Sequence, residues 1–388
     1  MKIRILVLIL CLLTIGSCAA AELPTDDNDI TGQILKTLSL NEVNNFITKI
    51  NYELGEDIPL LNNESIKKIA AAGLSLDWAT IKQAVLSRFF RELAANIHLM
   101  GKLLFLAVLS ALLQNLLNSF ERSSISTLAN SICHIFIMVI ALTAFYNAMQ
   151  LAQNTVGIMV GFMEALLPLL ITLLAGVGAV TSAALFSPLM LFVVTSISVL
   201  VKDIVLPLLF LSAVLHCVNF FSDYYRLSNL SSLLKQAGVV IMGFTMVIFV
   251  GVITIQGVAG GVADGIGLRT AKYAASTFIP VVGKMFADTV ELVMGASLLV
   301  KNAVGIFGIG TVATICAFPL IKMISLIVVM KVSGALVQPL GDEKIAKSLD
   351  TIGDNLLLIL AGVTAVALMM FLAITIIIGV GSMAMMLR

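Results

Sequence analysis

Four ionisable residues interrupt long apolar stretches of the sequence and are the first candidates for a functional role. Glu164 lies near the middle of one such stretch, Lys322 lies in a second, and Glu291 and Lys301 share a third. Ionisable side chains inside a membrane rarely face lipid, because they pair with other groups, line water or bind a substrate. We expect Glu164 to serve a pathway or subunit contact, or to bond a neighbouring helix. Lys322 is expected to extend toward a membrane interface.

The residues of common catalytic sites do not occur in the patterns in which they work. Gly283 and Lys284 are followed by Met285, where a phosphate-binding loop needs a hydroxyl for magnesium. The three histidines have no HExxH pattern, and the five cysteines lack metal-ligand spacing. We therefore predict that the chain is not an enzyme and that it has no cofactor, no metal site and no disulfide framework.

The composition excludes a water-soluble globular protein. Of the 388 residues, 60% are hydrophobic and 12% are charged, with a mean hydropathy of +1.08, whereas about a quarter of the residues in soluble proteins are charged. Residues 22–98 hold 18 charges in 77 positions, whereas residues 99–388 hold 25 in 290. The net charge of +1 leaves no excess for phosphates. The sequence thus predicts a polar region, a membrane region in the lipid bilayer, and no nucleic-acid partner.

The N-terminus has the layout of a secretory signal. Lys2 and Arg4 precede an apolar run, residues 5–15, which is too short to span a bilayer comfortably. Cleavage after Ala21 would define a signal peptide of residues 1–21, while the alternative is lipidation of Cys18. Either process, or an uncleaved anchor, would place residues 22–98 on the extracytoplasmic side.

Residues 22–98 are predicted to form a small helical region with a net charge of −4. Short helices are expected over Asn41–Glu53 and Glu64–Ala72. From Leu74 to Leu93 apolar residues recur every three or four positions, which predicts an amphipathic helix that contains Trp78. That helix either lies along the membrane surface before the first span or closes a small helical domain on itself.

The rest of the chain, residues 99–388, predicts an all-α, polytopic membrane protein with seven to nine spans. Seven apolar runs are long enough to cross a bilayer, and two further stretches, Ile204–Phe221 and Asp288–Phe307, are ambiguous because of proline or charge. The seven runs are Leu99–Leu117, Leu128–Tyr146, Val156–Leu174, Ala183–Val201, Val239–Val258, Gly310–Met330 and Leu356–Val380.

Four prolines suggest an internal duplication. Pro168 and Pro207 are 39 residues apart, as are Pro280 and Pro319, and each pair is followed by a polar stretch and a long final span. Transport proteins often carry repeats with proline-interrupted helices at matching positions. The units would cover residues 156–258 and 270–380. The alternative is chance, because membrane helices tolerate proline widely.

Six sequence blocks together point to one protein family. They are Leu76–Trp78, Phe89–Leu93, Phe162–Pro168, Gly176–Pro188, Phe278–Gly283 and Asp288–Gly310. With these blocks the chain resembles the stage III sporulation protein AE family of endospore-forming bacteria. The likeness covers nearly the whole chain, including the leader and the spacing of the apolar runs.

The resemblance implies a multi-pass protein of the mother-cell membrane around the forespore. It would act with the other membrane proteins of the stage III sporulation A operon and a separate ATPase subunit. That assembly would join a forespore membrane protein across the intermembrane space, as a channel or secretion-like apparatus needed for late forespore development. The competing hypothesis is a free-standing transporter for a small solute, which the possible duplication and the charged residues motivate.

Overall fold

The computed structural model is a long helical bundle. It describes residues 40–54, 60–72, 78–118, 123–221, 227–278, 282–340 and 342–386. Within these ranges every regular element is helical, which confirms the predicted all-α class. The predicted signal peptide, with Cys18 and Ala21, lies outside the described residues, as does Pro280.

Two short helices belong to the polar N-terminal region, close to the positions that the sequence predicts. They are α3 (Asn41–Leu54) and α4 (Asn63–Ala72). The Asn44 amide joins them, because it donates to the Leu61 carbonyl at 2.9 Å and accepts from the Leu61 N–H at 2.8 Å. Their apolar faces are buried in the same core as the long helices. The polar region therefore packs on the bundle, with α3 against α6 and α4 against α10.

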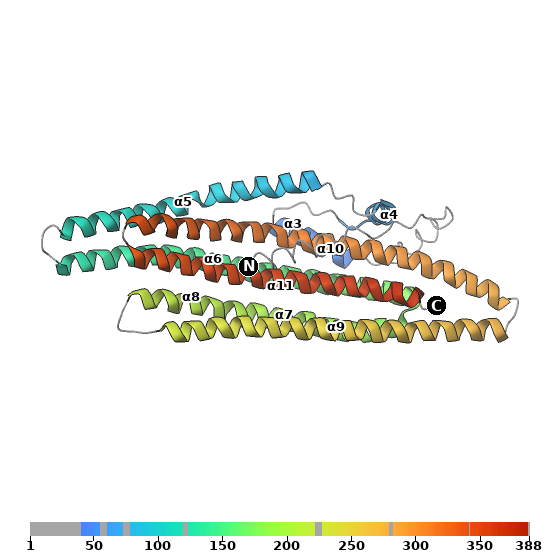
Figure 1. Ribbon diagram of the computed structural model, residues 1–388. Coiled ribbons are helices and arrows are strands. Elements are labelled where there is room, and N and C mark those ends of the chain that lie inside the picture. Colours follow the sequence, from blue (N-terminus) through green and yellow to red (C-terminus); the bar gives the residue numbers. More distant parts are fainter. Residues whose placement is uncertain are drawn as a thin grey trace.

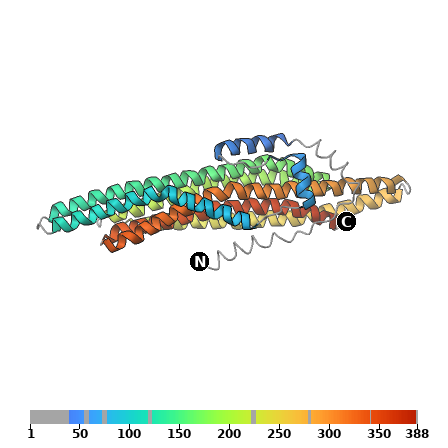
Figure 2. The same cartoon turned by 90° about the horizontal axis from the view of Figure 1, so that it is seen from above.

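The long helices run side by side along the length of the molecule, as Figures 1 and 2 show. Helix α7 continues into α8 through η2, a π-helical segment. A short 3₁₀ turn, η3, leads from α10 to α11. The bounds are α5 Trp78–Asn118, α6 Ser123–Gly176, α7 Val180–Ser198, η2 Val199–Val205, α8 Leu206–Phe221, α9 Ser228–Phe278, α10 Val282–Val337, η3 Gln338–Leu340 and α11 Glu343–Met386.

Six helical segments of the described chain are long and apolar enough to cross a membrane. The nine apolar stretches in the sequence overlap these six spans, because the helices continue through polar residues that look like boundaries in sequence. Residues 147–155, for example, hold neither proline nor glycine and do not interrupt α6. The six candidate spans are Lys82–Leu113, Ser131–Gly176, Val180–Asn219, Ser228–Thr270, Thr289–Leu340 and Glu343–Met383.

The predicted amphipathic helix and the first span form one continuous helix, α5, of 41 residues. Arg88 lies 5.0 Å from the centre of the Phe318 ring, and the Asn96 amide donates to the Ser325 hydroxyl at 3.3 Å. The first contact attaches the amphipathic stretch to α10, and the second lies just after that stretch. Residues 82–87 and Phe90 stay exposed, and the two arrangements that the sequence leaves open for this stretch stay predictions.

The bundle is much longer than a bilayer is thick. Helix α6 has 54 residues and α10 has 56, which at 1.5 Å per residue correspond to about 80 Å. The hydrocarbon core of a membrane is about 30 Å thick and needs about 20 helical residues. A large part of each long helix must therefore project beyond the hydrocarbon.

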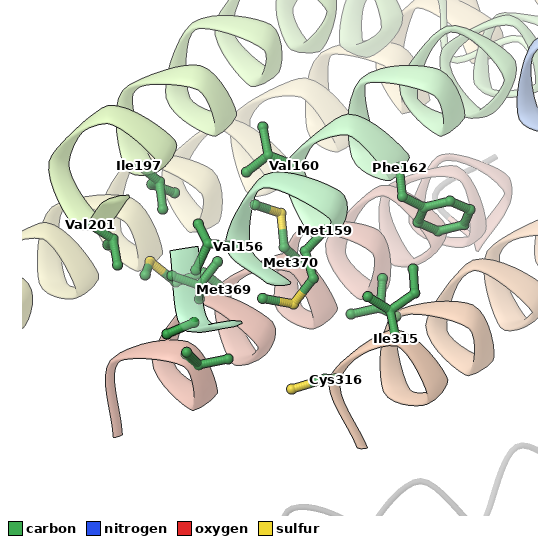
Figure 3. Packing of buried hydrophobic residues seen from close by; sticks show 14 of the residues in the cluster. Val156, Met159, Val160, Phe162, Ile197, Val201, Ile315, Cys316, Met369 and Met370 are labelled. Carbon is green, nitrogen blue, oxygen red and sulfur yellow. The ribbon is translucent and has the colours of Figure 1, made fainter. Parts of the chain in front are cut away.

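Helices α6, α10 and α11 form the centre of the bundle. Helix α5 packs on α6 and α10, and α7, α8 and α9 pack on the opposite side. Figure 3 shows the apolar side chains that meet there, which are fully buried or nearly so. They include Val156, Met159, Val160 and Phe162 of α6, Ile197 of α7, Val201 of η2, Ile315 and Cys316 of α10, and Met369 and Met370 of α11.

Three of the four prolines of the predicted duplication lie in the described part of the chain, and they do not share one setting. Pro168 and Pro319 lie inside α6 and α10, which remain continuous helices. Pro207 is the second residue of α8, directly after the π-helical segment. The duplication itself stays a prediction.

Candidate intramembrane polar sites

Lys301 is the most deeply buried of the four candidate residues. It lies on α10 with 0% of its surface exposed, and its ammonium group donates to the Ile378 carbonyl of α11 at 2.8 Å. Among the residues that the structure describes, no carboxylate lies within ion-pair distance of it. A lysine without a compensating charge is costly inside a membrane protein, so its presence indicates a specific role.

Two glycines bring α10 and α11 close enough for this contact. A Cβ atom at Gly381 would collide with the Lys301 ammonium, and a Cβ atom at Gly305 would collide with the Ile378 side chain. Glycine permits such approaches between membrane helices because it has no side chain. The buried lysine and the two glycines therefore form one packing unit.

Glu291 does not join Lys301. The two residues are ten positions apart on α10, a rise of about 15 Å. Glu291 is exposed, whereas Lys301 faces α11. The structure therefore assigns these two residues to separate places.

Glu164 lies on the outside of the bundle, where α6 borders α7. Its carboxylate is exposed and accepts a hydrogen bond from the Thr195 hydroxyl at 3.3 Å. Pro168, one turn along α6, has no N–H, so the Glu164 carbonyl also loses its usual helical donor. The outer face of this span thus presents a carboxylate and a main-chain carbonyl within one turn.

Lys322 is exposed on α10 and borders a groove between α5, α6 and α10. Lys102 of α5 borders the same groove, which has a volume of about 550 Å³. Lys102 was not a candidate, because it lies at the very start of a predicted span, where lysine is common. Only its position next to Lys322 in space distinguishes it.

A π-helical segment, η2, surrounds Lys202 in the middle of the third candidate span. Its Leu206 N–H donates to the Val201 carbonyl, five residues back. In the same pattern the Lys202 carbonyl would pair with residue 207, but Pro207 has no N–H. The Gln153 amide of α6 donates to that carbonyl at 2.9 Å instead. A glutamine near the end of an apolar run is the only sequence signal for this contact.

Replacing Gln153 with leucine should leave the Lys202 carbonyl without a donor. Because an unpaired buried polar group costs about 1–3 kcal/mol, we expect a loss of about 2 kcal/mol in the free energy of unfolding. Denaturant titration of the purified protein in detergent would measure it. The same change at Gln150, whose amide bonds the exposed Tyr146 hydroxyl at 3.0 Å, is the control. Equal losses in both variants would contradict the assignment.

Asp264 of α9 caps the beginning of α7. It is 3% exposed, and its two carboxylate oxygens accept from the Thr181 and Ser182 N–H groups at 2.8 and 3.0 Å. These are the second and third residues of α7, whose N–H groups have no partner inside the helix. Gly178, with a φ of +88°, makes the turn before them. This cap could not be predicted from the sequence, because the residues involved are more than 80 positions apart.

An ion-pair cluster joins α10 and α11 near the η3 turn. The Lys331 ammonium lies 2.6 Å from carboxylate oxygens of both Asp350 and Asp354. The two aspartates are one turn apart on α11 and so face the same side of the helix. All three side chains are at least partly exposed, so this cluster contributes little to stability.

The three histidines and three cysteines among the described residues do not form a metal site. The described part of the chain holds no group of three or more histidine, cysteine, aspartate or glutamate residues placed to bind a metal ion. Cys133, Cys217 and Cys316 are buried free thiols. What the described residues provide is therefore a set of polar contacts between helices.

Comparison with known proteins supports the resemblance seen in the sequence. The profile of the family described as Stage III sporulation protein AE matches residues 62–381. The protein of that name from Bacillus subtilis (strain 168) is 37% identical over 352 residues, which cover 91% of this chain and 88% of the relative. No solved structure matches. The chain therefore belongs to the stage III sporulation protein AE family.

Proposed function

We propose that this protein is an integral membrane subunit of a channel or secretion-like complex between the mother cell and the forespore. Its family supports a role in sporulation. The observation that carries the subunit role is the exposed carboxylate of Glu164 on the outer face of an apolar span. A carboxylate facing lipid is strongly unfavourable, so a contact with another membrane protein is the better environment for it.

The proposed partners follow from the same family resemblance. They are the other membrane proteins of the stage III sporulation A operon, a separate ATPase subunit, and a forespore membrane protein across the intermembrane space. The sequence lacks a phosphate-binding loop of its own, which agrees with a separate ATPase. In this proposal the protein spans the mother-cell membrane around the forespore, and its N-terminal region, delivered by a signal peptide, lies on the extracytoplasmic side.

Replacing Glu164 with glutamine in the native host tests the subunit role. The carboxylate is lost while size and shape are kept, so we expect normal abundance of the protein but at least tenfold less co-purification of its partner membrane proteins. Glu343→Gln is the matched control, because Glu343 is an exposed acid at the start of α11 paired only within its own helix. Undiminished co-purification together with normal sporulation would remove Glu164 from the proposed function.

Lys301 favours a second candidate, a free-standing transporter for a small solute. Its buried ammonium, bonded to a main-chain carbonyl at a helix–helix contact, is the kind of group that couples ions or binds substrates in transporters. In this case Glu164→Gln or Lys301→Met would abolish solute flux while partner co-purification stayed normal. That pattern would replace the subunit proposal.

A further inference from the structure

The groove between α5, α6 and α10 has the composition of a binding site. Eight of its lining side chains are aliphatic or methionine, and the polar ones include Lys102, Lys322 and Asn147. No aspartate or glutamate borders it. The groove therefore combines an apolar wall with two positive charges and an amide donor.

The two lysines are available to a ligand. Both side chains are exposed, and in the described ranges neither Lys102 nor Lys322 lies within ion-pair distance of a carboxylate. Both lie inside candidate spans, within Lys82–Leu113 and Thr289–Leu340. Positive charge in such a position calls for an anionic counterpart. Because both lysines border one groove, their flexible stems let both ammonium groups turn toward an anion bound in it.

Two other polar residues of the groove bond to the protein itself. The Asn96 amide, at its edge, donates both to the Glu92 carbonyl at 2.9 Å and to the Ser325 hydroxyl at 3.3 Å. The first bond lies within α5, and the second joins α5 to α10. Thr143, on the α6 wall, bonds its own helix at Val139. The Asn96 amide and the Thr143 hydroxyl are thus used within the protein, and the two lysines remain the charged groups of the groove.

We propose that this groove binds an anionic phospholipid, with the phosphate between Lys102 and Lys322 and an acyl chain along the apolar wall. Basic pockets between membrane helices bind acidic lipid head groups by this chemistry. The lining favours such a lipid, because two lysines without a bordering carboxylate suit a phosphate and the aliphatic side chains suit an acyl chain. The inference is independent of the proposed function.

The test uses the full-length protein, purified in detergent and freed of lipid. Binding of dioleoyl-phosphatidylglycerol and of dioleoyl-phosphatidylcholine would be measured by native mass spectrometry. We expect at least tenfold tighter binding of the anionic lipid to the natural protein. The Lys102→Gln, Lys322→Gln double variant should bind both lipids equally weakly, and the Lys102→Arg, Lys322→Arg variant should keep the preference.

Two further variants separate the site from general effects of charge and folding. Lys82→Gln with Lys235→Gln removes two charges elsewhere and should leave lipid binding unchanged. Ala144→Phe fills the groove while keeping both lysines, and it should also abolish the preference. Equal binding of the two lipids to the natural protein would overturn the proposal. Unchanged lipid binding in the Lys102→Gln, Lys322→Gln variant would also overturn it. If that variant then co-purified with less of a partner membrane protein, the groove would be assigned to a protein contact.

Discussion

Replacing Gly381 with leucine should prevent the normal packing of α10 against α11. Even a Cβ atom at this position would collide with the Lys301 ammonium, and overpacking a tight contact costs about 1–3 kcal/mol. The larger side chain would also break the hydrogen bond from Lys301 to the Ile378 carbonyl, which leaves a buried donor and costs a similar amount. We expect a loss of at least about 3 kcal/mol and little folded protein in the membrane.

Gly379→Leu is the matched control for this experiment. It lies two residues away on the same helix, and a Cβ atom there would meet no atom within 4 Å. Both variants would be quantified in membranes and by denaturant titration in detergent. If Gly381→Leu were as abundant and as stable as Gly379→Leu, the close contact between α10 and α11 would be incorrect.

Replacing Asp264 with alanine should destabilise the beginning of α7. Two N–H groups, those of Thr181 and Ser182, would lose their acceptor inside the protein. Each unpaired buried donor costs about 1–3 kcal/mol, so we expect the free energy of unfolding to fall by about 3 kcal/mol. The favourable interaction of the carboxylate with the N-terminus of α7 is lost as well.

Asp264→Asn separates charge from hydrogen bonding in this cap. The amide can accept only at its oxygen, so one of the two N–H groups stays unpaired, and the loss should be about half that of alanine. Asp203→Ala, at an exposed position of η2, should change stability little. Hydrogen exchange at Thr181 and Ser182 would locate the effect. Unchanged protection of these amides in Asp264→Ala would contradict the cap.

The fold class could be predicted from the sequence because only helices and closed β-barrels can span a membrane. The long apolar runs lack the alternation of polar and apolar residues that a barrel strand shows, so they indicate helices. The short helices α3 and α4 followed from local patterns of polar and apolar residues, which are encoded within each segment. The number of separate helices could not be predicted from the sequence. Polar residues such as Gln153 resemble boundaries in sequence, but contacts between helices satisfy them, so α6 continues through its full length.

Some of the polar sites could likewise be predicted from the sequence, and others could not. Glu164 and Lys301 are conspicuous in sequence because ionisable residues are rare in apolar runs. Their opposite environments, one exposed and one fully buried, depend on which neighbouring helix each side chain faces. Asp264 and Lys102 were missed because their roles come from residues distant in the sequence, Thr181 in one case and Lys322 in the other.

We propose that this protein is a subunit of a complex that the developing forespore requires. The most direct test is deletion of its gene in the native host, with microscopy and a reporter of late forespore gene expression. We expect arrest after engulfment, with a small forespore and a silent reporter, and rescue by the natural gene. Normal numbers of heat-resistant spores in the deletion strain would contradict it and would direct attention to solute uptake instead.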